Sequence, residues 1–260
     1  MSAEPQTPMT NTSYTKASSL YITWLIAWRQ MVEAVRTRST LVMTGFFLVF
    51  QTIIVLISLG PMVQGHLSPR EMSFAGTLMA FYLLFVGLMP STPSIGIASG
   101  VFAGDKERGC LTPLLVTPAS NTAIFAGKVL GAVLPALAYS IIGILVYLAE
   151  IAFLYGPDKL SLLPAGLSIL ILLVIPALSL LGATLASLIS SRVNTFQSAQ
   201  NYSSLLLFVL WSVLFVLVFL VTILGLWAFA AVVAAIFILD VLLIVVGANT
   251  WRREEVMARQ

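Results

Sequence analysis

The sequence predicts an all-α integral membrane protein with six transmembrane helices, a surface helix before the first span and a short helix between the second and third spans. Of its 260 residues, 59% are hydrophobic and only 9% are charged, whereas soluble domains carry roughly 25% charged residues. Long uncharged runs recur along the chain, and a helix of about 20 apolar residues crosses a hydrocarbon core about 30 Å thick. Together, the composition and these runs exclude a water-facing globule.

Six segments are long and apolar enough to span a bilayer. The last two come from one run, 205–248, whose single charge is Asp240. As one helix this run would extend about 66 Å at about 1.5 Å per residue, which is about twice the hydrocarbon thickness. We therefore expect it to turn near Gly225, with Trp227 beside the turn at the interface. The predicted spans are Leu41–Val63, Gly76–Ala103, Ile124–Phe153, Leu162–Ile189, Leu205–Leu224 and Leu226–Ala248.

Prolines and glycines interrupt several of these spans. Each proline removes a helix hydrogen bond and favours a kink, and glycines at intervals of four allow a neighbouring helix to approach closely. The prolines are Pro90, Pro93, Pro135 and Pro176, and the glycines are Gly96, Gly100 and Gly104.

Four regions follow from this pattern. Residues 1–19 form a polar N-terminal tail, 20–38 a surface helix, 39–249 the transmembrane domain with a loop at 104–121, and 250–260 a C-terminal tail. The first long apolar run begins near Leu41, too late for a cleaved signal peptide, so we expect a retained first helix.

The positive charges predict the orientation, because Lys and Arg are retained on the cytoplasmic side. Six spans place both termini on one side, and we expect that side to be cytoplasmic in a cell inner (cytoplasmic) membrane. The opposite side keeps only Arg70 and Lys159, and the net charge of +3 needs no nucleic-acid partner. The cytoplasmic set is Lys16, Arg29, Arg36, Arg38, Lys106, Arg108, Lys128, Arg192, Arg252, Arg253 and Arg259.

The segment before the first span has two stripes. Apolar residues, including Trp24 and Trp28, recur at spacings of three and four, and Arg29, Glu33 and Arg36 form a charged stripe. This pattern predicts either a helix lying along the inner membrane surface, with both tryptophans in the headgroup region, or an amphipathic helix packed on the bundle.

The loop at 104–121 begins with four consecutive charges, Asp105 to Arg108, that end the second span. Thr112 before Pro113 is a helix-start signature, and Thr117-Pro118 ends the helix about a turn later. A short helix would present Leu114 and Leu115 to a groove on a soluble partner. On the residues alone, a solvated loop remains open.

This loop resembles that of ABC-2 type ABC transporter permeases. The resemblance rests on the charged quartet, the following glycine and leucine-rich turn, Thr-Pro, and then Gly127-Lys128. It implies that the loop holds a coupling helix that docks on the ATP-binding subunit and that the surface helix is the family's elbow helix, with Trp24, Trp28, Arg29 and Arg36. Asp105, Cys110 and Pro113 depart from the common pattern, and the external segment between the fifth and sixth spans is nearly absent. The implied ATPase-coupling residues are Asp105, Lys106, Glu107, Arg108, Gly109, Leu111, Leu114, Leu115 and Pro118.

The chain contains no G-x-x-x-x-G-K-[ST] phosphate loop, so we expect no ATPase activity in it. The resemblance implies two copies of an ABC ATP-binding subunit, which hold the ATP and Mg²⁺, and a second permease that is either another copy or a relative. The chain has one cysteine, Cys110, and one histidine, His66. Because these are too few to form a His/Cys metal site, we expect no metal site and no cofactor in this chain.

Two acidic residues lie within predicted spans, Asp240 in the inner half and Glu150 near the outer face. Intramembrane carboxylates are costly and mark candidate substrate or ion pathways, although a structural partner for Asp240 and partial hydration for Glu150 are the simpler expectations. The apolar spans favour export of a small amphiphilic, peptidic or drug-like substrate. The alternatives are an ion- or proton-coupled secondary transporter that uses these carboxylates, or a membrane anchor subunit of a larger complex.

Overall fold

The computed structural model describes residues 19–63, 68–89, 92–109 and 119–250, and the regular elements in this part of the chain are all helical. Most of the two tails and the segment 110–118 lie outside the described residues. The elements in order are α1 (Ser19–Arg36), α2 (Arg38–Val63), α3 (Pro69–Leu88), α4 (Thr92–Glu107), α6 (Asn121–Leu154), the 3-10 helix η2 (Pro157–Leu162), α7 (Ala165–Arg192), α8 (Phe196–Leu224) and α9 (Leu226–Thr250).

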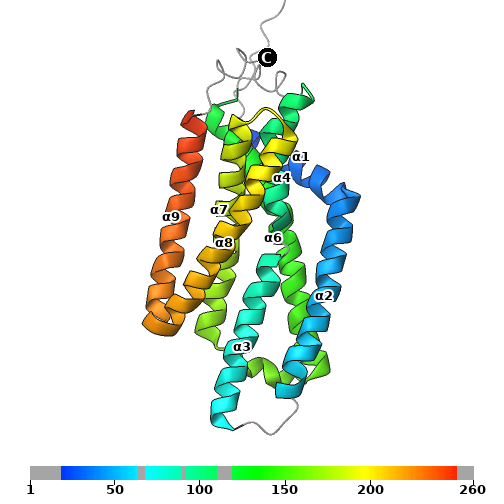
Figure 1. Cartoon of the computed structure of the whole chain (residues 1–260), viewed down its shortest axis with the longest axis vertical. Helices are drawn as coiled ribbons and strands as arrows, with labels where there is room; N and C mark the ends of the chain where they lie inside the picture. The colour runs from blue at the N-terminus through cyan, green and yellow to red at the C-terminus, as the bar shows by residue number, and fades with distance from the viewer. Residues whose placement is uncertain (1–18, 64–67, 90–91, 110–118, 251–260) are drawn as a thin grey trace, which may run out of the picture.

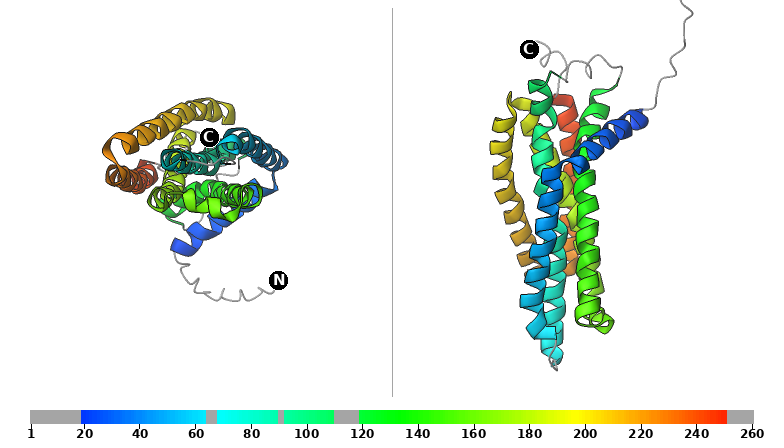
Figure 2. Two further views of the ribbon diagram at one scale, coloured as in Figure 1. Left: turned by 90° about the horizontal axis from the view of Figure 1, so that it is seen from below. Right: turned by 90° about the vertical axis from the view of Figure 1, so that its right-hand side faces the viewer.

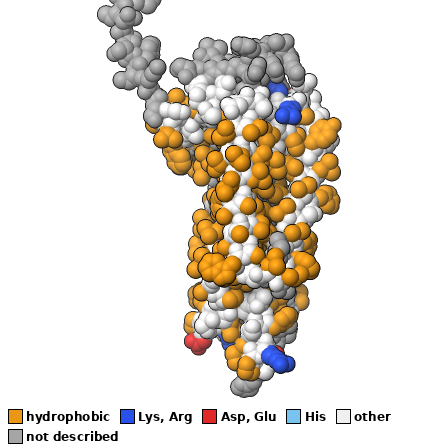
Figure 3. Space-filling view, turned by 90° about the vertical axis from the view of Figure 1, so that its left-hand side faces the viewer, with side chains coloured by type: hydrophobic (Ala, Val, Ile, Leu, Met, Phe, Trp, Pro, Cys, Tyr) orange, Lys and Arg blue, Asp and Glu red, His pale blue; other side chains and the backbone are white. Residues whose placement is uncertain are grey.

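Six helices of the described chain are long and apolar enough to cross a membrane, as the sequence predicts: α2, α3, α6, α7, α8 and α9. They run side by side in one elongated bundle (Figures 1 and 2). Hydrophobic side chains cover the middle of the visible face, and charged side chains lie towards its two ends (Figure 3). This distribution matches a bundle whose middle is surrounded by hydrocarbon.

The predicted second span differs from the structure. Instead of one kinked helix over Gly76–Ala103, the described residues form α3, which ends at Leu88, and α4, which begins at Thr92, and Pro90 between them lies outside the described residues. A proline cannot donate a helix hydrogen bond, which favours a helix end close to it, and α3 ends at Leu88, two residues before Pro90. By contrast, Pro135 and Pro176 lie inside α6 and α7, which continue past them.

The predicted turn in the long apolar run is confirmed. Helix α8 ends at Leu224, α9 begins at Leu226, and Gly225 between them has a φ of +79°. Glycine adopts this left-handed conformation without the steric cost that other residues meet. Trp227 follows with 90% of its surface exposed.

The basic residues gather at one end of the bundle. This end carries α1, the last turn of α4, the start of α6 and the connection from α7 to α8 (Figure 1). The other end carries η2 and the start of α3, with Lys159 and Arg70. The described basic residues at the first end are Arg29, Arg36, Arg38, Lys106, Arg108, Lys128 and Arg192.

Helix α7 forms the centre of the bundle, with 61% of its most apolar window buried, whereas the corresponding windows of α2 and α8 are 17% buried. Polar contacts join α6 to α3 inside this core. Tyr147 donates a 2.8 Å hydrogen bond to the Met79 carbonyl, and Ser140 donates one of 2.6 Å to the Gly87 carbonyl. Buried bonds of this kind satisfy groups that lipid cannot.

Candidate functional site: the charged end of α4

Helix α4 ends within its run of four charges, as the sequence predicts. The last helical residue is Glu107, and the Gly109 amide donates a 3.1 Å bond to the Lys106 carbonyl. Gly109 has a φ of +66°, the left-handed conformation that commonly ends a helix and that glycine adopts most easily. The charges therefore sit on the final turn of a helix that reaches the centre of the bundle.

Asp105 forms an ion pair inside the chain. Its carboxylate lies 2.6 Å from the ammonium group of Lys128 on α6, and the exposed fractions of the two side chains are 37% and 3%. Lys128 also donates a 2.6 Å hydrogen bond to the Val101 carbonyl, and its ammonium lies 4.5 Å from the centre of the Phe102 ring. The pair joins α4 to α6 across the loop that separates them in the sequence.

The next two charges bind the connection between α7 and α8. Lys106 donates hydrogen bonds of 2.8 Å and 3.1 Å to the carbonyls of Ser191 and Val193, where α7 ends. Glu107 accepts a 2.9 Å bond from the amide of Phe196, the first residue of α8. A cation at a helix C-terminus and an anion at an N-terminus both match the helix dipole.

An aromatic contact lies beside these polar ones. A Cβ added at Gly100 would lie 2.6 Å from a ring carbon of Phe196, and one at Gly104 would lie 3.8 Å from the same ring. Gly100 and Gly104, which the sequence predicts to allow the close approach of a neighbouring helix, therefore lie against an aromatic ring. Gly96 has open space beside it.

We call Asp105, Lys106, Glu107 and Lys128 the α4 clasp. Its contacts tie the last turn of α4 to α6, to the end of α7 and to the start of α8. Arg108 and Gly109 are exposed and lie just beyond the clasp. Leu111, Leu114, Leu115 and Pro118 lie outside the described residues, so their role remains a prediction.

Two clasp partners are missing from the predicted site. The sequence places Lys128 among the cytoplasmic charges and in the Gly127-Lys128 pair of the family resemblance, but not among the site residues, although a lysine within an otherwise apolar helix signals a buried partner. Phe196 carried no signal, because a backbone amide that receives a carboxylate is not visible in the sequence.

Helix α1 has the predicted amphipathic pattern and packs on α6. Gly127 and Gly131 face it, and a Cβ at Gly131 would lie 2.6 Å from the Gln30 Cβ. The opposite face leaves Trp24 and Trp28 about half exposed, 52% and 49%, with ring centres 6.1 Å apart. The helix leaves the bundle at a slant (Figure 2).

The charged stripe of α1 lies in water-accessible positions. Arg29 and Glu33 form a 3.3 Å ion pair one helical turn apart, and Arg36 is exposed near the end of the helix. This pair lies at the predicted spacing. Whether the tryptophan face contacts lipid remains a prediction.

The two intramembrane carboxylates do not form one site. Glu150 lies four residues before the end of α6 and accepts a hydrogen bond from Thr52 of α2, while its second oxygen is buried without a partner in the described chain. Asp240 is fully buried on α9, and neither carboxylate oxygen has a partner among the described residues. The expected Ser, Thr or Asn partner of Asp240 is therefore not found there.

Fold and site together define a multi-pass α-helical membrane protein with a charged clasp at one end of its second span. In a comparison with protein families, residues 21–213 match the ABC-2 type transporter family, so the chain belongs to that family. Its members are membrane transport subunits, and this chain is an ABC-2 type permease. A comparison with curated proteins found no match.

Proposed function

We propose that this chain exports a small amphiphilic, peptidic or drug-like substrate, powered by ATP hydrolysis in a separate ABC ATP-binding subunit. The observation that carries the proposal is the α4 clasp, because it links the charged end of the predicted coupling segment to α6, α7 and α8. A partner that docks on 104–121 and moves would act directly on the last turn of α4. The clasp contacts would pass that displacement to helices in the centre of the bundle.

The proposed assembly contains two permease chains and two ATP-binding subunits. Its ATP and Mg²⁺ are held by those subunits, and closure around ATP would move both docked segments together. A single chain supplies one bundle, and the largely exposed apolar faces of α2 and α8 leave room for lipid or a second permease.

The proposed location is the inner (cytoplasmic) membrane with both termini in the cytoplasm. The end of the bundle with the clasp also carries most of the described basic residues, and the positive-inside rule assigns such an end to the cytoplasm. An ATP-binding subunit would then meet the clasp on the side where ATP is present.

The coupling role is tested by replacing Leu114 and Leu115 together with aspartate and purifying the tagged chain from membranes. We expect the ATP-binding subunit to be lost while the permease remains monodisperse. The matched control places two aspartates at exposed positions of η2, at the opposite end, as Pro157→Asp with Ser161→Asp. Equal co-purification of both double variants would contradict docking at the leucine turn.

A second candidate is proton- or ion-coupled transport through Asp240. The observation in its favour is a fully buried carboxylate without a described partner. Membership of an ATP-driven family and the clasp favour the first function. Transport that persists after ATP is removed but collapses with the proton gradient would reverse that order.

A further inference from the structure

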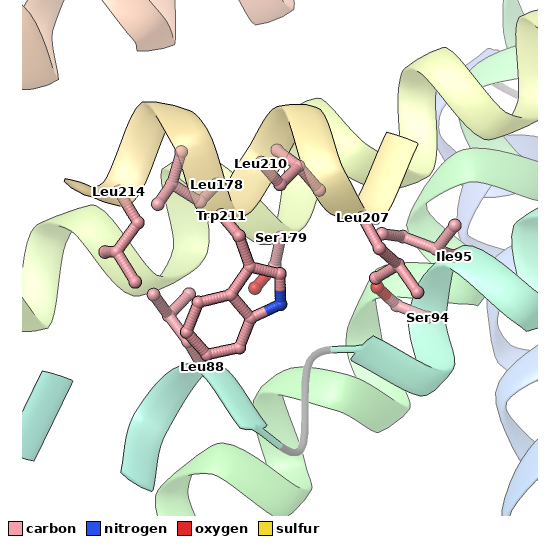
Figure 4. A pocket seen from close by; sticks show the side chains of 9 residues that line it. All are labelled: Leu88, Ser94, Ile95, Leu178, Ser179, Leu207, Leu210, Trp211 and Leu214. Carbon is pink, nitrogen blue, oxygen red and sulfur yellow. The ribbon is translucent and has the colours of Figure 1, made fainter. Parts of the chain in front are cut away.

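A pocket lies where the second span is divided. Its wall includes Leu88, the last residue of α3, together with Ser94 and Ile95 from the first turns of α4, and α7 and α8 close the other sides (Figure 4). The indole of Trp211 lies across the pocket between Leu88 and Ser179 (Figure 4). The remaining lining residues are Leu178, Leu207, Leu210 and Leu214.

The pocket is a small cavity between α3, α4, α7 and α8. Helices α3 and α8 meet beside it through the rings of Phe85 and Trp211, whose centres are 5.9 Å apart. The free volume is about 40 Å³. This is more than one water needs, which is about 10–15 Å³ by the same kind of measure, but too little for a bulky polar headgroup.

The lining selects an apolar occupant. Six of the nine lining residues are Leu or Ile, and the Ser179 hydroxyl already donates a 2.6 Å bond to the Ile175 carbonyl of its own helix. An apolar cavity of this kind does not hold water well, because water needs two to four polar partners. A hydrocarbon chain needs none.

The depth of the pocket points to the same occupant. Trp211 lies about 22 Å along α8 from Phe196, and Ser94 lies about 20 Å along α4 from Glu107, at about 1.5 Å per residue. Both distances start at the charged end, so the pocket falls within a hydrocarbon layer about 30 Å thick. The abundant molecules at that depth are acyl chains.

We propose that this pocket binds the end of an acyl chain of a bilayer phospholipid. The chain end fills the gap below the α3–α4 division and packs against Trp211. The pocket shares α4, α7 and α8 with the clasp. The binding itself does not depend on the proposed ATPase partner and can be tested without it.

Trp211 is an internal reporter of a bound chain, because bromine atoms on a lipid chain quench tryptophan fluorescence on contact. The chain has five tryptophans, and replacing Trp24, Trp28, Trp227 and Trp251 with phenylalanine leaves Trp211 alone. This variant is reconstituted in vesicles of phosphatidylcholine brominated either in the middle of the acyl chain or close to the headgroup. We expect stronger quenching by mid-chain bromine, and equal or weaker quenching would overturn the proposal.

Two further variants separate a chain in the pocket from lipid on the outer face of α8. In Gly182→Ala the new Cβ would lie 2.7 Å from the Leu210 Cδ1 and 3.1 Å from the Ile95 Cγ1, which moves both side chains towards the cavity. In Ser179→Phe a ring occupies the space directly. We expect either change to lower mid-chain quenching about twofold, since a cavity of this size has room for one chain end.

The matched control is Gly96→Ala, also a glycine-to-alanine change, whose added Cβ meets no atom within 4 Å. It should leave quenching unchanged. Quenching that stays the same in Gly182→Ala and Ser179→Phe would show that lipid reaches Trp211 only from outside, and the proposal would then fail. If Ser179→Phe does not fold, Gly182→Ala, which adds only one methyl group, still decides.

Discussion

Removing either charge of the Asp105–Lys128 pair should destabilise the protein, and removing Asp105 should cost more. Lys128 has 3% of its side chain exposed, whereas Asp105 has 37%. In Asp105→Asn the ammonium stays buried and loses the Asp105 carboxylate, while its contacts with the Val101 carbonyl and the Phe102 ring remain. Loss of one partner of a buried pair costs about 3–5 kcal/mol.

In Lys128→Met the orphaned group is Asp105, which water can reach. The cost should therefore fall to about 1–3 kcal/mol, mainly the loss of a charge-assisted hydrogen bond. Methionine keeps most of the apolar stem of lysine against the Phe102 ring, so packing changes little. The two single variants thus differ in their expected loss of stability because the two charged side chains are unequally exposed.

The double variant Asp105→Asn with Lys128→Met completes the test. It removes the buried cation together with its partner, so it should be more stable than Asp105→Asn alone, although a simple sum of the two losses would make it the least stable. Thermal unfolding in detergent and in nanodiscs gives the ranking of all four proteins. If Lys128→Met unfolds at the lowest temperature, or if the losses add, the burial argument is refuted.

Three other predictions follow from the described contacts. Gly131→Ala should separate α1 from α6 and lower stability by about 1–3 kcal/mol, because its Cβ would lie 2.6 Å from the Gln30 Cβ; a melting temperature equal to that of Gly96→Ala would contradict this packing. Thr52→Val should lower stability by about 1–3 kcal/mol by leaving the Glu150 carboxyl group without its donor, whereas Thr52→Ser keeps the hydroxyl and should match the parent protein in the same unfolding assay. Asp240→Asn should leave ATP-driven transport intact in vesicles, and loss of transport with unchanged folding would assign the coupling ion to Asp240.

Much of the fold can be predicted from the sequence because the bilayer imposes one simple requirement. Apolar length alone locates the spans, and the run 205–248 is too long to be one helix, so a turn at Gly225 follows. The end of α3 at Leu88, two residues before Pro90, was harder to foresee. Pro135 and Pro176 share the same local chemistry, yet α6 and α7 continue through them. Whether a proline bends a helix or ends it depends on what packs around it, and local sequence does not contain that information.

The site was predictable only in its location. The four charges at 105–108 mark the end of a helix and a family resemblance, but they do not specify their partners. Lys128 is 23 residues from Asp105, and no periodic rule relates positions on two different helices. The bond between Glu107 and Phe196 depends on a backbone amide, which every residue except proline offers. Asp240 shows the opposite case, since a buried carboxylate suggests a partner and the described residues supply none.

We infer that this permease works with a separate ATP-binding subunit docked near the α4 clasp. The most direct measurement is affinity purification of the chain from its native membrane, followed by mass spectrometry and an ATPase assay on the eluted complex. We expect a Walker-type ATPase in equal stoichiometry with the permease and ATP hydrolysis by the complex. A solitary permease that elutes without any ATPase, although folded and monodisperse, would contradict it.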